Sequence, residues 1–246
     1  MALKEDNQNH LLMHAVGANV AGQIGSVLAG GIIGSALGHI LPESLKEHLP
    51  TMFGMCSIAI GINSIIKASA MTPVVLALLV GFTIGHLLHL EQWTSRFFHK
   101  LVKAMRLGGD GIDMEFYITA VALFCCSGFG WYSTLTEGIA GDPSLLFSKA
   151  VLDGFTALIF ASTLGKSICA IPLPQCVILL CVFGAGRLLA GVLTPTMFAD
   201  LSACGGVLTM AAGFRVSKIK SVPLVDLMPA LLLVMPFSLL WTMVMG

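Results

Sequence analysis

The chain has 246 residues, of which 56% are hydrophobic and only 11% are charged, and its mean hydropathy is +0.91. A water-soluble domain carries roughly 25% charged residues, so this composition predicts an integral membrane protein. The formal net charge of zero argues against a nucleic-acid-binding surface. The seven cysteines lie in apolar segments without metal-site spacing, and we expect neither a metal nor another cofactor.

Residues 1–15 form a polar N-terminal tail, and the apolar run that follows is too long and too rich in glycine for a cleavable signal peptide. We expect residues 16–246 to form a single all-α transmembrane domain. Eight apolar runs are candidates for crossing a bilayer core of about 30 Å. They are residues 16–40, 51–68, 71–90, 114–135, 144–165, 174–194, 202–217 and 223–245. The second and the seventh run are short for a full crossing.

Small residues recur at every fourth place of the first run, which builds a flat strip along one helix face. Such a strip lets a second helix backbone approach closely, or it leaves room for a solute; we favour the packing role. The strip consists of Gly22, Ser26, Gly30, Gly34 and Gly38.

The connection over residues 91–112 is the longest one, and it alternates basic and aromatic residues. It is either an amphipathic helix on the membrane surface or a basic connector that sets the orientation of the chain. The residues that indicate this are Trp93, Arg96, Phe97, Phe98, Lys100, Leu101, Lys103 and Arg106.

Basic connections lie on the inner side of a membrane, which places residues 91–112 and the turn over residues 215–220 inside. The connection over residues 136–143 contains Glu137 and Asp142 but no Lys or Arg, so we expect it outside. Eight crossings then place both termini outside.

The fifth apolar run carries two charges. Asp142 as N-cap and Pro143 as the first helical residue open this run, which extends to Gly165. Lys149 and Asp153 lie four residues apart, so they share one helix face within pairing reach. At about 1.5 Å per residue, Asp153 lies roughly 15 Å into the helix, near the bilayer midplane. Charges there usually face the protein interior, a water-filled cavity or a substrate path.

Lys149 and Asp153 are equally compatible with a substrate or coupling-ion site and with a structural ion pair. Arg187 lies about midway along the sixth run and either pairs with Asp153 or holds an anion; we favour the pair. Gln23 and Gln175 are neutral, so they either bind neighbouring helices by hydrogen bonds or contribute to a shared site.

Other polar positions allow simpler interpretations. His86, near the end of the third run, is either an interfacial residue or a group that titrates near neutral pH. Asp200 and Asp226 are expected to be interfacial residues or helix caps, and Glu137 a residue of the outside loop. The glycines and cysteines of residues 125–130 predict either a broken helix at a site or a packing kink.

A shift of the chain against itself by 152 positions produces a series of identical residues. Among the matches are Gln23 with Gln175, Gly34 with Gly186, Gly54 with Gly206 and Gly61 with Gly213. The shift relates the first three runs to the last three, and an offset of five crossings inverts the second copy in the membrane. Inverted repeats are common in secondary transporters, whose sites lie near the midplane between the repeats.

Several stretches resemble the YqgA-like (YdfK-like) family of bacterial inner-membrane proteins. They are residues 138–146, 149–153, 159–165, 194–206 and 227–233. The resemblance covers nearly all of the chain after about residue 17 and implies a multi-pass protein of the bacterial inner membrane, with both termini in the periplasm by the argument above. The family has no assigned function, so the resemblance supplies neither a substrate nor a catalytic residue.

Two positions depart from the family pattern. Gln23 stands where the family often has Asn, and His86 stands after Gly85 where Glu is usual. An imidazole in place of a carboxylate would change any cation site at His86.

We expect a transporter or channel for a small solute or ion, with a charged midplane site. The alternative is a non-transporting scaffold or partner-binding subunit whose buried charges are structural. We do not expect an enzyme, because HExxH, GxSxG and paired aspartates in adjacent runs are absent from the sequence. The expected partners are the lipid bilayer and a small solute or ion, and we expect no nucleic-acid partner. The sequence is compatible with a homo-oligomer.

The eight-crossing topology predicts the location of the C-terminus. A reporter fused after Gly246 that is active only in the cytoplasm should stay inactive, because an even number of crossings returns the chain to the outside. Activity of that reporter would contradict the topology.

Overall fold

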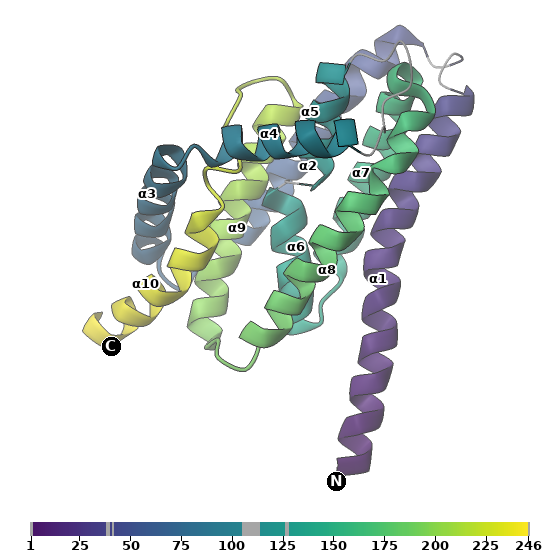
Figure 1. Ribbon diagram of the computed structural model, residues 1–246. Coiled ribbons are helices and arrows are strands. Elements are labelled where there is room, and N and C mark those ends of the chain that lie inside the picture. The colour runs from purple at the N-terminus through teal and green to yellow at the C-terminus, as the bar shows by residue number, and fades with distance from the viewer. Residues whose placement is uncertain (1, 38–39, 41, 105–113, 126–127, 246) are drawn as a thin grey trace. The chain divides into compact units, whose positions relative to one another are not determined.

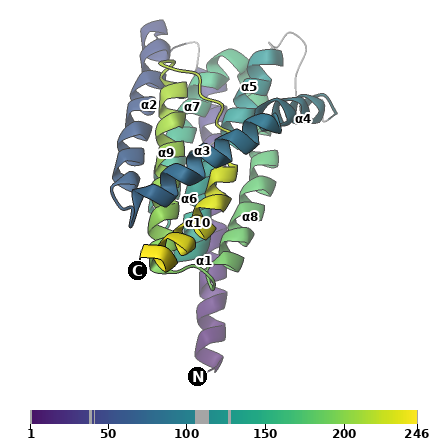
Figure 2. The ribbon, with the colours of Figure 1, turned by 90° about the vertical axis from the view of Figure 1, so that its left-hand side faces the viewer.

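A computed structural model of the protein describes residues 2–37, 40, 42–104, 114–125 and 128–245. Every regular element within these ranges is helical, and none of these residues forms a strand (Figures 1 and 2). The elements are α1 (Ala2–Leu37), α2 (Glu43–Ile65), α3 (Met71–Leu87), α4 (Leu90–Ala104), α5 (Met114–Cys125), α6 (Gly128–Ala140), α7 (Ser144–Leu164), the 3-10 helix η1 (Gly165–Ala170), α8 (Pro172–Leu189), α9 (Pro195–Val216) and α10 (Pro229–Met245). The all-α expectation is therefore confirmed for the described part of the chain.

The chain forms two compact units, each assembled from segments that are far apart in sequence. Unit 1 comprises Met1–Ile40 and Ser133–Gly191, and unit 2 comprises Leu41–Tyr132 and Val192–Gly246. Most of α6 belongs to unit 1, together with α1, α7, η1 and α8.

Among the described residues, four helical stretches are long and apolar enough to cross a membrane. They are Val20–Leu37, Ser144–Ala170, Pro172–Leu189 and Pro195–Val216. A fifth candidate is α3 followed by Leu90–Phe97, a pair bent by 55°. Of the eight predicted runs, those over α2, over α5 with α6, and over α10 do not meet this criterion, although α10 is a shorter apolar helix.

Two predicted runs have different bounds in the structure. The seventh run was expected to be short, but α9 has 22 residues and begins at Pro195. Thr194 precedes it as N-cap, and its hydroxyl accepts a hydrogen bond from the Met197 amide at 3.3 Å. The predicted run over residues 114–135 contains α5, which is described to Cys125, and α6, which is described from Gly128 and extends to Ala140, beyond the predicted end of the run. Residues 126 and 127, within the stretch 125–130 for which the sequence predicts a broken helix or a packing kink, lie outside the described residues.

Unit 1 depends on the close approach of α1 and α7. A Cβ atom added to Gly30 would lie 2.0 Å from the Gly154 carbonyl oxygen, and one added to Gly34 would lie 2.1 Å from the Leu158 carbonyl oxygen. The packing role predicted for the strip is therefore confirmed at these glycines. Gly22 faces open space, with nothing within 4 Å of an added Cβ, and Gly38 lies outside the described residues.

Both ends of α7 agree with the predicted bounds, Pro143 and Gly165, to within one residue. The helix begins at Ser144, and the Asp142 carboxylate accepts a hydrogen bond from the Ser144 amide at 2.9 Å. The helix ends at Leu164, because Gly165 adopts a φ of +59°, a left-handed conformation that favours glycine.

Unit 2 contains a second close helix contact, between α2 and α9. An added Cβ at Gly61 would lie 2.6 Å from the Gly206 carbonyl oxygen, and one at Gly206 would lie 2.7 Å from the Gly61 carbonyl oxygen. Gly54 and Gly213 approach each other in the same reciprocal way. Both contacts exclude larger side chains, so the two helix backbones lie directly against each other.

The predicted connection over residues 91–112 contains helix α4, which Figure 1 shows bent away from α3. The bend follows His89, whose φ is +52°. On α4, Trp93 and Phe97 stack on each other and are exposed, and Arg96 is exposed beside them. This arrangement favours the amphipathic surface helix over a plain basic connector. The side chains of Phe98, Leu101 and Lys103 and the whole of Arg106 lie outside the described part of the chain.

The contact between α1 and α7 predicts different effects of two glycine-to-alanine substitutions on the free energy of unfolding. Gly30→Ala should lower the free energy of unfolding in detergent by about 1–3 kcal/mol, because the new methyl group meets the Gly154 carbonyl oxygen. The control Gly25→Ala, on the same helix with nothing within 4 Å, should leave it unchanged or raise it by up to about 1 kcal/mol. Equal effects of the two substitutions would contradict the described packing.

Candidate functional site

The centre of α7 carries a buried carboxylate. Asp153 lies nine residues after Ser144, or about 14 Å along the helix, within a stretch of membrane-spanning length. Lys149 precedes it by one turn on the same face, and the two residues are only 4% and 5% exposed. The sequence prediction of two charges in the middle of this helix is therefore confirmed.

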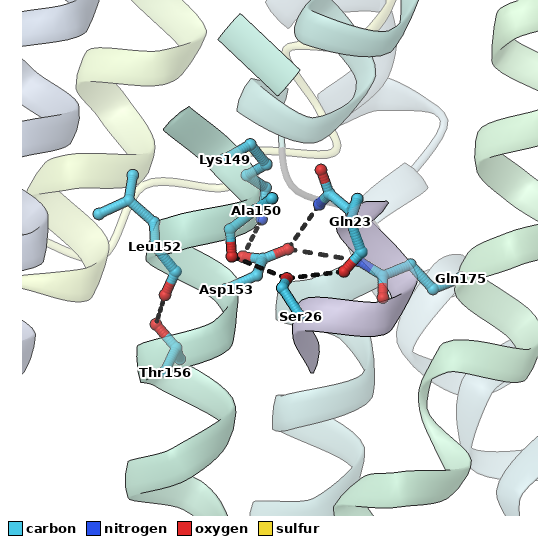
Figure 3. A network of polar contacts seen from close by, with 8 residues as sticks. All are labelled: Gln23, Ser26, Lys149, Ala150, Leu152, Asp153, Thr156 and Gln175. Carbon is cyan, nitrogen blue, oxygen red and sulfur yellow. Dashed lines mark hydrogen bonds and ion pairs between the residues drawn. The ribbon is translucent and has the colours of Figure 1, made fainter. Parts of the chain in front are cut away.

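Three helices of unit 1 bring donors to Asp153 (Figure 3). The Lys149 ammonium group of α7 pairs with carboxylate oxygen Oδ1. Oxygen Oδ2 accepts hydrogen bonds from Gln23 Nε2 of α1 at 2.8 Å and from Gln175 Nε2 of α8 at 3.3 Å. Both glutamine side chains are fully buried. The carboxylate thus accepts one charged and two neutral donors, as a buried anion requires.

Ser26 fixes α1 against α7 beside this cluster. Its hydroxyl lies 2.7 Å from the Gln23 carbonyl oxygen and 2.8 Å from the Ala150 carbonyl oxygen. Ala150 lies one residue after Lys149, so Ser26 sets the separation of the two helices where Gln23 reaches Asp153 (Figure 3). The sequence indicated Ser26 only as a member of the packing strip.

The cluster is electrically neutral but not fully hydrogen-bonded. Asp153 and Lys149 carry opposite charges and the glutamines carry none. Gln23 Oε1 is buried and has no hydrogen-bond partner among the described residues. A buried acceptor without a donor costs roughly 1–3 kcal/mol. This oxygen is therefore available to a cation, a water molecule or a polar substrate.

Two of the predicted site residues lie away from the cluster. Arg187 is exposed, and it follows Gln175 by twelve residues, about 18 Å along α8. The preferred pairing of Arg187 with Asp153 is wrong, because Lys149, one turn away on the same helix, occupies the carboxylate instead. His86 belongs to unit 2, where its 65% exposed side chain lies with Nδ1 3.2 Å from Asp226 Oδ2.

Two acidic residues of unit 2, Asp200 and Asp226, bind backbone amides. Asp200 Oδ1 accepts hydrogen bonds from the Ser69 and Ala70 amides at 2.9 Å, directly before α3, and Oδ2 accepts one from the Ser238 hydroxyl at 2.6 Å. Asp226 Oδ1 accepts a hydrogen bond from the Glu91 amide at 2.8 Å, at the start of α4. The predicted capping role is confirmed for Asp226, whose carboxylate binds an amide in the first turn of α4. The prediction of an interfacial residue or cap is wrong for Asp200, which is buried inside α9 and binds the segment before α3 rather than a helix-end amide.

The structure adds two acidic residues that the sequence misjudged or missed. The sequence predicts Glu137 in an outside loop, but α6 continues to Ala140 and Glu137 is only 1% exposed. The sequence gives no signal for Glu91, yet its carboxylate accepts hydrogen bonds from Arg215 Nη1 at 2.6 Å and from the Val225 amide at 3.0 Å. A short-range pattern could not indicate this contact, because Glu91 and Arg215 are far apart in sequence.

The described part of the chain contains no cluster of His, Cys, Asp and Glu side chains that could bind a metal ion. No three His, Cys, Asp or Glu residues in those ranges lie close enough to hold a metal ion. The cluster at Asp153 consists of one carboxylate, one ammonium group and two amides.

The chain belongs to the family described as "Protein of unknown function (DUF554)", which matches residues 18–239. It is 38% identical to "Uncharacterized protein YqgA" of Escherichia coli (strain K12), over 88% of this chain and 94% of that protein. It is 27% identical to "Uncharacterized membrane protein YdfK" of Bacillus subtilis (strain 168), over 84% of this chain and 89% of that protein. The resemblance seen in the sequence is therefore confirmed.

A shorter match carries no argument about function. It is 61% identical to "Probable oxaloacetate decarboxylase beta chain" of Pasteurella multocida (strain Pm70), but it covers 13% of this chain and 8% of that protein. No solved structure is significantly similar to the chain.

The buried pair predicts strong coupling between Lys149 and Asp153. Lys149→Met and Asp153→Asn should each lower the free energy of unfolding by about 3–5 kcal/mol, because each leaves one charge buried without its partner. The double variant should recover most of that loss, because it buries no charge. Unfolding in detergent measures all three, and additive losses in the double variant would contradict the pairing.

Proposed function

We propose that this DUF554 protein is a multi-pass membrane transporter or channel for a small solute or ion, with its site at Asp153 and Lys149. One observation carries the proposal: a buried carboxylate in the middle of a membrane-spanning helix is reached by side chains from two other helices. Charges at that depth are costly and usually belong to substrate or ion pathways.

An inverted repeat is part of this proposal. The shift of 152 residues moves Glu43, the first residue of α2, to position 195, which is the first residue of α9. The same shift moves Ile65, the last residue of α2, to position 217, one residue after the end of α9. Two helices with matching bounds at a constant offset support a duplicated unit.

The glycine contacts of unit 2 support the same repeat. Adding 152 to Gly54 gives Gly206, and adding 152 to Gly61 gives Gly213. Gly61 contacts Gly206, and Gly54 contacts Gly213, so each glycine touches the counterpart of the other. Reciprocal contacts of this kind are expected for two copies related by a two-fold axis.

The glutamines of unit 1 extend the argument to the site. Gln23 and Gln175 are also separated by 152 positions, and both donate to the same oxygen of Asp153. In repeat-built transporters, the site lies where the repeats meet. The convergence of two equivalent side chains on one carboxylate oxygen is the arrangement that such a duplication would produce.

For the complete topology we propose eight crossings: α1, α2, α3, α5 with α6, α7, α8, α9 and α10. The protein would then lie in the bacterial inner membrane with α4 on the cytoplasmic surface and both termini in the periplasm. The exposed aromatic and basic residues of α4 support its place at the membrane surface.

The competing function is a membrane scaffold or partner-binding subunit. The specific observation in its favour is that Lys149 and Asp153 already neutralise each other, as a purely structural pair would.

Flux measurements separate the two functions. Purified protein in liposomes is assayed for uptake over a panel of alkali cations, protons, halides and small organic acids. The wild type should transport at least one member, and the double variant Lys149→Met/Asp153→Asn should lose that flux while remaining folded. The control Lys166→Met, at an exposed lysine of the same stretch, should keep it.

If the wild type transports no member of the panel above background, the transport function is contradicted and the scaffold is favoured. Unchanged flux in the folded double variant would show that transport does not use this site.

A further inference from the structure

We infer that Asp153 binds a monovalent cation in exchange for the proton of Lys149, so that the site performs a one-for-one exchange of cation for proton. This inference rests on the proposed function and names its substrate class. It is derived from three features of the cluster: its charge, the position of Lys149 and the amide groups around the carboxylate.

The net charge of the cluster determines the charge of the cation that it can bind and requires that a proton leave when the cation binds. In the described state, the negative charge of Asp153 and the positive charge of Lys149 sum to zero. If a monovalent cation entered and Lys149 stayed charged, the cluster would carry one net positive charge at the membrane midplane, which is costly. If Lys149 loses one proton to water as the cation binds, the sum returns to zero. A divalent cation would leave one positive charge even after this loss.

Lys149 is suited to serve as the internal competitor of the cation. Its ammonium group is a compact charge on a flexible four-carbon stem, and it pairs with oxygen Oδ1 of Asp153. A neutral amine has no charge to hold it against the carboxylate, so deprotonation frees Oδ1 for the incoming cation. The ammonium group and the cation therefore occupy the same place in turn.

The amides supply further cation ligands. Gln23 Nε2 lies 2.8 Å from Asp153 Oδ2, while Oε1 of the same amide is buried without a hydrogen-bond partner among the described residues. A half-turn of this amide exchanges the two atoms and directs Oε1 to the cation. Gln175 carries a second amide at the same carboxylate oxygen, 3.3 Å away. Carboxylate and amide oxygens are preferred ligands of hard cations.

Binding is tested with NaCl, KCl and LiCl as probes, and with choline chloride as the control salt. Purified wild-type protein in weakly buffered detergent solution should show a higher unfolding midpoint in at least one alkali salt than in choline chloride. Addition of that salt should release about one proton per chain, as read from a pH indicator. The apparent Kd should fall about tenfold for each unit of pH increase, because one proton competes with one cation.

Variants distinguish the exchange from simple salt effects. Lys149→Met should bind the cation without releasing a proton and without the pH dependence, and the salt should restore its lowered unfolding midpoint. Lys149→Met/Asp153→Asn should bind no cation. Gln23→Met should weaken binding about tenfold to hundredfold, whereas Gln92→Met, at an exposed glutamine of α4, should not.

The outcomes separate this inference from the proposed function. If no alkali salt shifts the unfolding of the wild type, or if binding releases no proton, the exchange is wrong, although flux of another solute would still support a transporter. If the cation binds with proton release but no solute crosses the liposome membrane, the exchange stands and the transport function is wrong. Proton flux that is independent of all three cations would also contradict the exchange.

Discussion

The burial of one carboxylate, Asp153, constrains the whole of unit 1. A charge in the middle of a membrane-spanning helix must be neutralised and hydrogen-bonded, because lipid offers neither ions nor donors. Lys149 supplies the charge from one turn away, and Gln23 and Gln175 supply donors from other helices. Gln23 reaches the carboxylate because α1 lies against α7 through glycines, so the packing strip and the site are parts of one arrangement.

Polar groups in the two units serve different purposes. In unit 2 the carboxylates of Asp200 and Asp226 bind backbone amides directly before α3 and in the first turn of α4, and each also has one side-chain contact, with Ser238 and His86 respectively. Glu91 joins Arg215 to the segment before α10. The Asp226 contact satisfies an amide at the start of α4, and the Glu91 contacts fix α4 to the rest of unit 2. In unit 1 the carboxylate of Asp153 binds only side chains, whose rotamers and protonation can change. This difference is why the proposed chemistry belongs to Asp153.

Close glycine contacts determine which helices pack against each other in both units. In lipid there is little hydrophobic drive between helices, so small residues that let backbones touch supply the packing. The contacts of Gly30 with Gly154 and of Gly61 with Gly206 leave no space for a methyl group. In unit 1, the close approach of α1 and α7 brings the Gln23 side chain within hydrogen-bond distance of Asp153.

The sequence by itself determined the class of protein, the start of α7 to within one residue, and the position of Lys149 and Asp153 on one helix face. These properties depend on composition, local capping and helical periodicity, which neighbouring residues fix. Only the tertiary structure decided that Gln23 and Gln175 meet at one oxygen, that Arg187 is exposed, and that Glu137 is buried. Those outcomes depend on which helices pack together and at what rotation, and a single sequence carries no record of that choice.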